Sequence, residues 1–372
     1  MTLGILYRDE LKEYDFGEGH PFRGDRYTNF PIFIKKKLPE NDNYLFIESK
    51  PASDEDLLLI CEEEYIDFTR DYYHNAHKGN ISHDLERTFY LYQSVDNRPR
   101  RGPGRIEEAA RVIVGQAKTA VDLILSDKFK KVISIGGGMH HAKRRYGEGF
   151  CIYNDVAYVA EYLMENYFFD RILILDTDAH AGNGTSDYFY SSSKVLFVDI
   201  HQDPHTLYPG TGFIHQIGEG DGAGYTVNIP MPLYADDDSY SLVFKEIITP
   251  LTEDFKPQLI IRNGGSDPHF SDQLTNLGLT VDGFGMIGEN VKNMANSVCD
   301  GKVIDLIASG YNKNILPYCW MALISGLAEF NISIEEPETL SKRFKDDFSY
   351  EETGRIVQEI KNHLKDYWSC LN

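Results

Sequence analysis

The feature that most constrains the fold of this chain is a set of short segments dominated by Val, Ile, Leu and Phe. Apolar runs of this length, with few polar residues between, are typical of strands buried on both faces of a parallel sheet. The segments that fit are 131–135, 171–176, 195–200, 225–229, 258–262 and 302–308. We therefore expect a parallel sheet built from these strands.

Longer segments with apolar residues at helical spacing lie between several of the expected strands. They are 105–125, 155–168, 241–255 and 281–298. Such an alternation predicts an α/β fold, in which helices cover both faces of a central, mostly parallel sheet.

The rest of the chain carries weaker signals. Residues 1–94 show few strand patterns, and we expect them to form loops and helices around the sheet. Residues 95–105 are rich in Arg, Gly and Pro, which indicates a surface loop. Residues 329–372 are charged and amphipathic and predict peripheral helices. We interpret residues 1–372 as a single domain.

Composition narrows the classes of partner. The formal net charge of −21 argues against nucleic-acid binding, which needs clustered Lys and Arg. An acidic, soluble surface accounts for this charge, and a cationic partner is the alternative.

The five cysteines are scattered and form no CxxC, so we expect neither disulfides nor a thiolate zinc site. We also expect a cytoplasmic location. We read no signal peptide and no membrane span, and the oligomeric state stays open.

Polar clusters follow the expected strands with regularity. "GGGMHH" follows 131–135, "TDAHAGNGT" follows 171–176, and "HQDPHTLYPGTG" follows 195–200. "NGGSDPHFSD" and "SGYNKN" follow the strands at 258–262 and 302–308. Open parallel sheets bind ligands outside the carboxyl ends of their strands, so these clusters predict one binding edge.

The segment "LDTDAHAGNG" suggests a metal site. Asp176, Asp178 and His180 alternate, so their side chains would point the same way in an extended segment. Carboxylates and imidazole suit Zn²⁺ or Fe²⁺, and Asp267 in "GGSDP" is the best candidate for a third ligand from another loop. The alternative is that these aspartates cap turns or helices.

The adjacent His140 and His141 would then have a use. Activation of a water needs a base, and departure of an amine needs an acid, so two imidazoles with different partners could divide these roles. Asp176 would hold one of them and Asn183 would orient the other. The alternative is a pair exposed to solvent. No GxGxxG or GxxxxGK[ST] pattern follows the glycines, which argues against nucleotide binding.

Together, "GGGMHHAKRRYGEGFCIYND", "LDTDAHAGNG", "LYPGTG", "NGGSDP" and "SGYNKN" resemble the motifs of the zinc-dependent histone deacetylase superfamily. This group includes acetoin-utilisation-type deacetylases and acetylpolyamine amidohydrolases. The resemblance covers about residues 14–325 and begins with "GHPFRGDRY". It implies the three-layer arginase/deacetylase fold and hydrolysis of an acetyl or short acyl group from a lysine-like amine, in a peptide or small molecule, or from a polyamine.

The resemblance also implies a role for each matching residue. The implied metal ligands are Asp178, His180 and Asp267. His141 would be the general base, with His140 assisting. Asp176 would pair with His140, and Asn183 with His141. Tyr311 would donate a hydrogen bond to the oxyanion of the tetrahedral intermediate.

Further residues match the binding parts of the family. The implied substrate-channel residues are Gly149, Phe150, Tyr208 and Leu274. Arg26 matches an arginine near an inner cavity. The implied monovalent-cation site, for K⁺, is formed near Asp176, Asp178, His180, Asp199 and Ile200.

The chain departs from the family pattern at several positions. Asn183 stands where many members have Asp, and Asp199 replaces a common Ser. "IASGY" has fewer glycines before Tyr311 than is usual, which predicts a stiffer loop. The loop at 91–105 is basic, which leaves the substrate open.

Two alternatives remain. An arginase-type ureohydrolase shares the fold but needs a second metal, and Gly182 stands where its "DAHxD" motif requires Asp. A non-catalytic member that binds an acetylated ligand would have lost a metal ligand, the histidine pair or the tyrosine.

Overall fold

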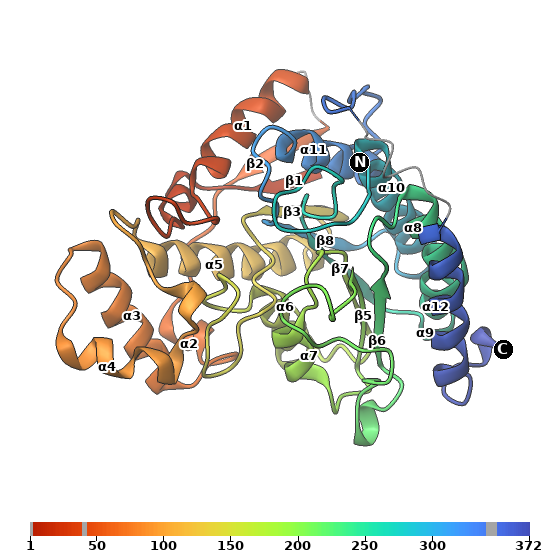
Figure 1. Cartoon of the computed structure of the whole chain (residues 1–372), viewed down its shortest axis with the longest axis horizontal. Coiled ribbons are helices and arrows are strands. Elements are labelled where there is room, and N and C mark those ends of the chain that lie inside the picture. Colours follow the sequence, from red (N-terminus) through yellow and green to blue (C-terminus); the bar gives the residue numbers. More distant parts are fainter. Residues whose placement is uncertain (1–2, 39–42, 340–347) are drawn as a thin grey trace. The chain divides into compact units, whose positions relative to one another are not determined.

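The computed structural model describes residues 3–38, 43–339 and 348–372. The chain forms two compact units, Met1–Phe168 and Phe169–Asn372. Figure 1 follows the chain through its helices and strands. The single domain expected from the sequence stays a prediction.

The first unit is built on three parallel strands in the order β2-β1-β3. Their bounds are β1 Leu3–Leu6, β2 Tyr44–Ile47 and β3 Lys131–Ile135. The strand expected at 131–135 is therefore present. The expectation of loops and helices alone for residues 1–94 is wrong, because this segment contains β1 and β2. Each has four residues, too few for a periodic pattern to reveal a strand.

Helices account for most of the remainder of this unit. They are α1 Asp25–Lys37, α2 Asp54–Leu57, α3 Glu63–His77, α4 His83–Tyr92, α5 Ile106–Leu125 and α6 Asp155–Tyr167, with short 3₁₀ turns η1 Asp9–Glu13 and η2 Val95–Asn97. The apolar side of α5 packs against β1, β3 and α6. The predicted helices at 105–125 and 155–168 thus match α5 and α6.

The second unit contains five parallel strands in the order β8-β7-β4-β5-β6. Their bounds are β4 Ile172–Asp176, β5 Val195–Gln202, β6 Thr226–Met231, β7 Leu259–Gly264 and β8 Val303–Ile307. Every residue of β4, β5, β7 and β8 is buried, as continuous apolar runs predict. All five expected strands are present within two residues of their predicted ends.

The helices of this unit are α7 Asn183–Phe189, α8 Asp237–Val243, α9 Thr249–Phe255, α10 Val281–Val298, α11 Leu316–Ala328 and α12 Phe348–Leu364 (Figure 1), with 3₁₀ turns η3 Gly220–Gly222 and η6 Ser369–Leu371. The single helix expected at 241–255 is divided, because a π-helical turn, η4 Phe244–Ile248, separates α8 from α9. Pro250 lies just after this turn and has no N–H to continue the α-helical hydrogen bonds.

Close backbone contact joins α10 to α11. A Cβ atom on Gly288 would lie 2.2 Å from the carbonyl oxygen of Leu323, and one on Gly326 would lie 2.2 Å from that of Gly285. Residues beyond 329 include α12, and Trp368 donates from Nε1 to the carbonyl of Gly224 at 2.7 Å. Residues 340–347 of the segment predicted as peripheral helices lie outside the described residues. Among the described helices, none is long and apolar enough to cross a bilayer.

Candidate active site

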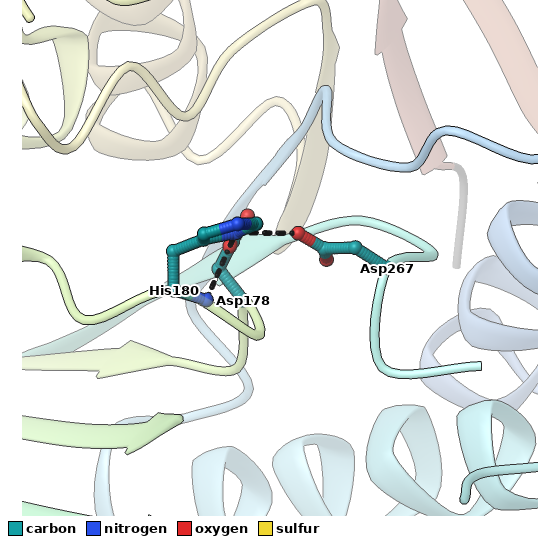
Figure 2. A group of neighbouring side chains, drawn as sticks. All are labelled: Asp178, His180 and Asp267. Carbon is teal, nitrogen blue, oxygen red and sulfur yellow. Dashed lines mark hydrogen bonds and ion pairs between the residues drawn. The ribbon is translucent and has the colours of Figure 1, made fainter. Parts of the chain in front are cut away.

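Three side chains predicted as metal ligands lie together in the second unit. Figure 2 shows the imidazole of His180 between the carboxylates of Asp178 and Asp267. His180 Nδ1 is 3.0 Å from Asp178 Oδ1 and 3.1 Å from Asp267 Oδ2. One potential ligand atom from each residue lies within 4.8 Å of the others, and all three residues are buried. Two carboxylates and one imidazole are a donor set suited to a divalent cation such as Zn²⁺ or Fe²⁺.

The electrostatics of this cluster also suit a cation. Burial and then the neighbouring Asp178 carboxylate raise the pKa of Asp267 to about 7. Burial disfavours a charged imidazole, but hydrogen bonds to Asp178 and Asp267 outweigh it and raise the pKa of His180 to about 10. Two buried carboxylates therefore compete for one proton on the imidazole, and a divalent ion would neutralise both.

The loop that supplies two of these residues, 177–183, follows β4, and we call it the aspartate loop. Residues 178–180 form bends, so the extended geometry assumed for the alternating residues is wrong. The backbone N–H of Asp178 turns back to donate to Asp176 Oδ1 at 3.1 Å. The N–H of His180 donates to Asp178 Oδ1 at 2.9 Å, and this turn brings the two ligand candidates together.

Asp176 lies at the end of β4, behind the cluster. Its Oδ2 accepts a hydrogen bond from Asn263 Nδ2 at 2.8 Å, and Asn263 is on the neighbouring strand β7. Thr177 Oγ1 donates to the carbonyl of Asn263 at 3.0 Å. Asp176 is thus fixed by β7 and by the N–H of Asp178, while Asp178 takes part in the cluster itself.

Asp267 reaches the cluster from the turn after β7. Gly264 has a φ of +133°, and a Cβ there would lie 2.9 Å from the backbone nitrogen of Asp178. A side chain at 264 would therefore separate the two loops. Oδ1 of Asp267 accepts from Ser309 Oγ at 2.9 Å, whereas Oδ2 faces His180.

Tyr311 lies beside the cluster on the loop after β8. Its ring centroid is 6.3 Å from that of His180, and the rings are nearly perpendicular. The Tyr311 N–H donates to Asp272 Oδ2 at 2.7 Å. Burial raises the pKa of Asp272, although hydrogen bonds from backbone N–H groups oppose the rise.

The residues expected around a monovalent cation lie on β4, β5 and the aspartate loop. Asp199 Oδ2 accepts from the N–H of Gly182 at 2.9 Å. Asp199 Oδ1 is 3.1 Å from His201 Nδ1, an ion-pair contact without good hydrogen-bond alignment. Ile200 lies between them in the buried strand β5. Asn183 begins α7, next to Gly182.

The first unit contains the turn at 136–142, which we call the histidine turn. His140 and His141 are 3% and 4% exposed, and their ring centroids are 4.1 Å apart. The Asp155 carboxylate accepts from the N–H of Met139 at 2.8 Å and from that of Gly138 at 2.9 and 3.0 Å. Burial raises the pKa of Asp155 to about 6, although these hydrogen bonds oppose the rise. The exposed histidine pair considered as an alternative is thus wrong.

The segment Gly149–Phe150 is held from both ends. The N–H of Gly149 donates to Asp96 Oδ2 at 2.7 Å, and Tyr14 Oη donates to the carbonyl of Phe150 at 2.7 Å. Gly149 has a φ of +60°, and a Cβ there would lie 2.2 Å from Cδ2 of His141. The glycine therefore allows the Phe150 segment to pack against the His141 ring.

Other predicted residues have simple placements. Arg26 is buried on α1, and its guanidinium lies 4.0 Å from the Phe22 ring centroid. Tyr208 and Leu274, in the second unit, are 42% and 39% exposed, which leaves both accessible to a ligand.

Comparison with known proteins identifies the family. Residues 20–327 match the family described as the histone deacetylase domain. A protein of Archaeoglobus fulgidus named as a probable deacetylase is 33% identical over 378 residues, covering 100% of each chain. The acetoin utilization protein AcuC of Staphylococcus aureus strain MSSA476 is 35% identical over 329 residues, covering 87% of this chain and 81% of AcuC.

A solved structure extends the likeness to the fold. The crystal structure of the HDA15 HD domain matches with a TM-score of 0.81 and 22% identity, covering 100% of this chain and 98% of that one. The chain belongs to the histone deacetylase family, whose members hydrolyse amide bonds and are generally metal-dependent. The predicted α/β fold of the arginase/deacetylase type is confirmed.

Several supporting residues were not predicted from the sequence. They are Asp96, Asp155, Asn263, Asp272 and Ser309, which contact predicted site residues or their backbone. Asp155 stands in the quoted motif "FCIYND", so its position in that motif was the available signal. Asn263, Asp272 and Ser309 also stand in the quoted clusters "NGGSDPHFSD" and "SGYNKN", and Asp96 lies in the loop at 95–105, but the groups that these four residues contact depend on the fold.

Proposed function

We propose that the chain is a metal-dependent deacetylase that removes an acetyl or short acyl group from a lysine-like or polyamine amine. The observation that carries this proposal is the buried group Asp178, His180 and Asp267, in a chain of the histone deacetylase family. The same donor set would hold Zn²⁺, with Fe²⁺ as the alternative. When bound, the ion would supply a Lewis acid that polarises the amide carbonyl and makes a water nucleophilic near neutral pH.

The residues of the chain have separate roles in the proposed reaction. Asp178, His180 and Asp267 hold the ion, and the hydrogen bonds around Asp176 keep the aspartate loop in place. Tyr311 donates from its hydroxyl to the oxygen of the amide carbonyl as negative charge develops there. The hydrogen bond from the Tyr311 N–H to Asp272 holds Tyr311 in position before the reaction begins.

The histidine turn supplies the proton transfers in this proposal. His141 accepts a proton from the attacking water as the new C–O bond forms, and this proton passes to the amine nitrogen as the C–N bond breaks, while His140 assists as the neighbour of His141. Protonation of both rings at a centroid separation of 4.1 Å would be opposed by repulsion, so the pair carries one proton at a time most readily. Asp176 and Asn183 are proposed as the partners of His140 and His141.

The substrate is proposed to be an acetylated amine with an extended alkyl chain. The residues proposed to line its path are Gly149, Phe150, Tyr208 and Leu274, and Arg26 is proposed to serve the inner cavity. Aromatic and aliphatic side chains favour a methylene chain, whose burial contributes about 0.8 kcal/mol per CH₂ group. The proposal includes no nucleic-acid or membrane partner, and the proposed location is the cytoplasm.

A substrate screen tests the proposed function. Purified protein would be incubated with acetyl-lysine peptides, acetylated polyamines and short acyl-lysine substrates, before and after removal of metal with a chelator. We expect release of acetate that is lost with the metal and restored by added Zn²⁺ or Fe²⁺. Hydrolysis that persists after complete metal removal would contradict the mechanism. Release of urea from arginine or agmatine would favour the ureohydrolase alternative, and binding of acetyl-lysine without turnover would favour the non-catalytic one.

The proposal also includes a K⁺ site, and Asp199 is one of the residues proposed to form it. Asp199 Oδ2 accepts a hydrogen bond from the N–H of Gly182, whereas Oδ1 lies 3.1 Å from His201 Nδ1 as an ion-pair contact without good hydrogen-bond alignment. A K⁺ ion near Asp176, Asp178, His180 and Ile200 would therefore share Asp199 with His201. Turnover measured in K⁺ and in a large organic cation at equal ionic strength tests this site, and equal rates would argue against it.

A further inference from the structure

Ser309 lies on the loop after β8, where it contacts the proposed metal ligand Asp267 and precedes the proposed catalytic Tyr311 by two residues. Its hydroxyl donates to Asp267 Oδ1 at 2.9 Å. Asp267 Oδ2 faces His180 Nδ1 at 3.1 Å, so the two oxygens of this carboxylate have different partners. Among the described residues, Ser309 is the one side-chain donor to Oδ1. The hydroxyl therefore fixes which oxygen Asp267 presents to the cluster.

The backbone of Ser309 is itself held in place. Its carbonyl accepts from the N–H of Ser266 at 3.0 Å and from Nε1 of the buried Trp320 at 3.1 Å. A Cβ on Gly265 would lie 2.1 Å from that carbonyl oxygen, so only glycine at 265 allows this approach. A rigid backbone at Ser309 gives its hydroxyl a fixed direction, which a freely moving side chain would not have.

The next two residues continue the connection to Tyr311. Gly310 has a φ of +122°, and a Cβ there would lie 1.9 Å from Ser266 Oγ. Tyr311 follows directly, with its N–H bonded to Asp272 at 2.7 Å. The segment 309–311 is thus tied to Asp267 at its first residue and to Asp272 at its last. Loss of the Ser309 hydroxyl would therefore alter the positions of the Asp267 carboxylate and of Tyr311.

We propose that Ser309 is a positioning residue that orients Asp267 toward the divalent ion and ties the Tyr311 loop to the metal site. This inference rests on the proposed function, because it assigns Asp267 as a ligand. A donor to the non-coordinating oxygen of a ligating carboxylate restricts its rotation and increases metal affinity. The hydrogen bond from Ser309 to Asp267 also restrains the backbone of the loop before Tyr311.

Two kinds of variant isolate the hydroxyl. Ser309→Ala removes Oγ and keeps Cβ. Ser309→Thr and Ser309→Val differ from each other in one hydroxyl at nearly equal volume, so any packing strain is common to both. Ser325→Ala is the matched control, because Ser325 on α11 is a part-buried serine whose Oγ donates to the carbonyl of Phe330 at 2.8 Å.

The first measurement is metal affinity, obtained from competition with a chelator and therefore independent of turnover. We expect Ser309→Ala to bind Zn²⁺ about 10- to 100-fold more weakly than the wild type. Ser309→Val should bind more weakly than Ser309→Thr by a similar factor, and Ser325→Ala should bind like the wild type. The second measurement is steady-state kinetics at saturating metal, where we expect kcat of Ser309→Ala to fall while KM changes little.

The outcomes separate this inference from the proposed function. A wild-type protein that binds no divalent ion would overturn both. If the wild type binds the ion, and Ser309→Ala and Ser309→Val bind it as tightly as the wild type does, the role of Ser309 alone would be overturned. Equal weakening of the Thr and Val variants would also overturn it, since packing rather than the hydroxyl would then be responsible.

Discussion

The histidine turn and the aspartate loop both follow a buried strand and both carry buried polar side chains, yet these side chains are satisfied in different ways. At the histidine turn, the carboxylate of Asp155, the first residue of α6, accepts three hydrogen bonds from the backbone N–H groups of Gly138 and Met139. At the aspartate loop, the carboxylate of Asp178 and that of Asp267, which comes from the turn after β7, converge on the His180 imidazole. The first arrangement is complete with groups of the protein, and the second has an excess of negative charge that suits a bound cation.

This contrast separates the part of the site that depends on metal from the part that does not. The histidine turn is defined by its own hydrogen bonds and should keep its geometry whether or not an ion is bound. The aspartate loop should gain stability from the ion, because a ligand that binds only the folded state shifts the folding equilibrium toward it. Substitutions at the aspartate loop, at Tyr311 and at the histidine turn should therefore have different effects.

Asp178→Asn should have the largest effect. This substitution removes one of the two negative charges from the proposed metal centre. Only His180 and Asp267 of the proposed ligands then remain unchanged, so we expect loss of tight metal binding and of turnover. Zn²⁺ should raise the melting temperature of the wild type and leave that of Asp178→Asn unchanged. Metal content, melting curves and deacetylation of an acetyl-lysine peptide check this, with the exposed Asp221→Asn as control. Normal metal content in Asp178→Asn would contradict the assignment.

Tyr311→Phe should separate metal binding from catalysis. It removes the proposed hydrogen bond to the developing oxyanion, and loss of such a donor lowers kcat by roughly 10²- to 10³-fold. Metal content should stay as in the wild type, because the substitution leaves the proposed ligands Asp178, His180 and Asp267 unchanged. Tyr350→Phe, a change of an exposed tyrosine on α12, serves as control. Near-normal kcat would remove Tyr311 from the chemistry.

Gly149→Ala should disturb the histidine turn without touching the aspartate loop. The new Cβ would lie 2.2 Å from Cδ2 of His141, at a residue with a φ of +60°, so the imidazole must move. We expect kcat to fall by up to about 10²-fold, as misplacement of a catalytic group by an ångström can do. Gly102→Ala is a matched control, since its φ is +68° and its Cβ would meet nothing within 4 Å. Equal losses in both variants would mean that backbone strain, and not the imidazole, is responsible.

Asp155→Asn should have the smallest effect on turnover and a clear effect on stability. The pKa of Asp155 is raised by burial to about 6 in the folded protein, so its carboxyl binds a proton more tightly there than in the unfolded chain. The stability that this group contributes is complete at pH values below about 4 and is lost as the pH rises through about 6.

As the pH rises from below about 4 to above about 6, the unfolding free energy of the wild type relative to that of Asp155→Asn should therefore decrease by up to about 3 kcal/mol. Denaturant unfolding at several pH values measures the difference, with Asp282→Asn as control for a general effect of charge. A difference that is constant with pH, or that increases, would show that Asp155 does not titrate in this way.

Much of the fold was predictable because buried parallel strands leave a strong pattern. The segments at 171–176 and 258–262 are nearly continuous apolar runs, and they form β4 and β7. Strands β1 and β2 of the first unit were not predictable in the same way, since they have four residues each. The division of the helix at 241–255 depends on how the chain accommodates Pro250 locally.

The site shows the same limit of sequence reasoning. Asp178, His180 and Asp267 could be grouped because the chemistry of their side chains and their places after strands were both visible in the sequence. The supporting contacts could not, because Asn263 and Ser309 act through neighbours 87 and 42 residues away. Such contacts exist only once the strands are paired, and no local pattern encodes them.

The central claim is that one divalent ion binds between the aspartate loop and Asp267. Crystals of the metal-loaded protein, measured on both sides of the zinc absorption edge, test it most directly through the anomalous difference map. The account predicts one strong peak, about 2.0–2.2 Å from a carboxylate oxygen of Asp178, a carboxylate oxygen of Asp267 and Nδ1 of His180. A pair of peaks at this place, or a single peak away from these three residues, would contradict it.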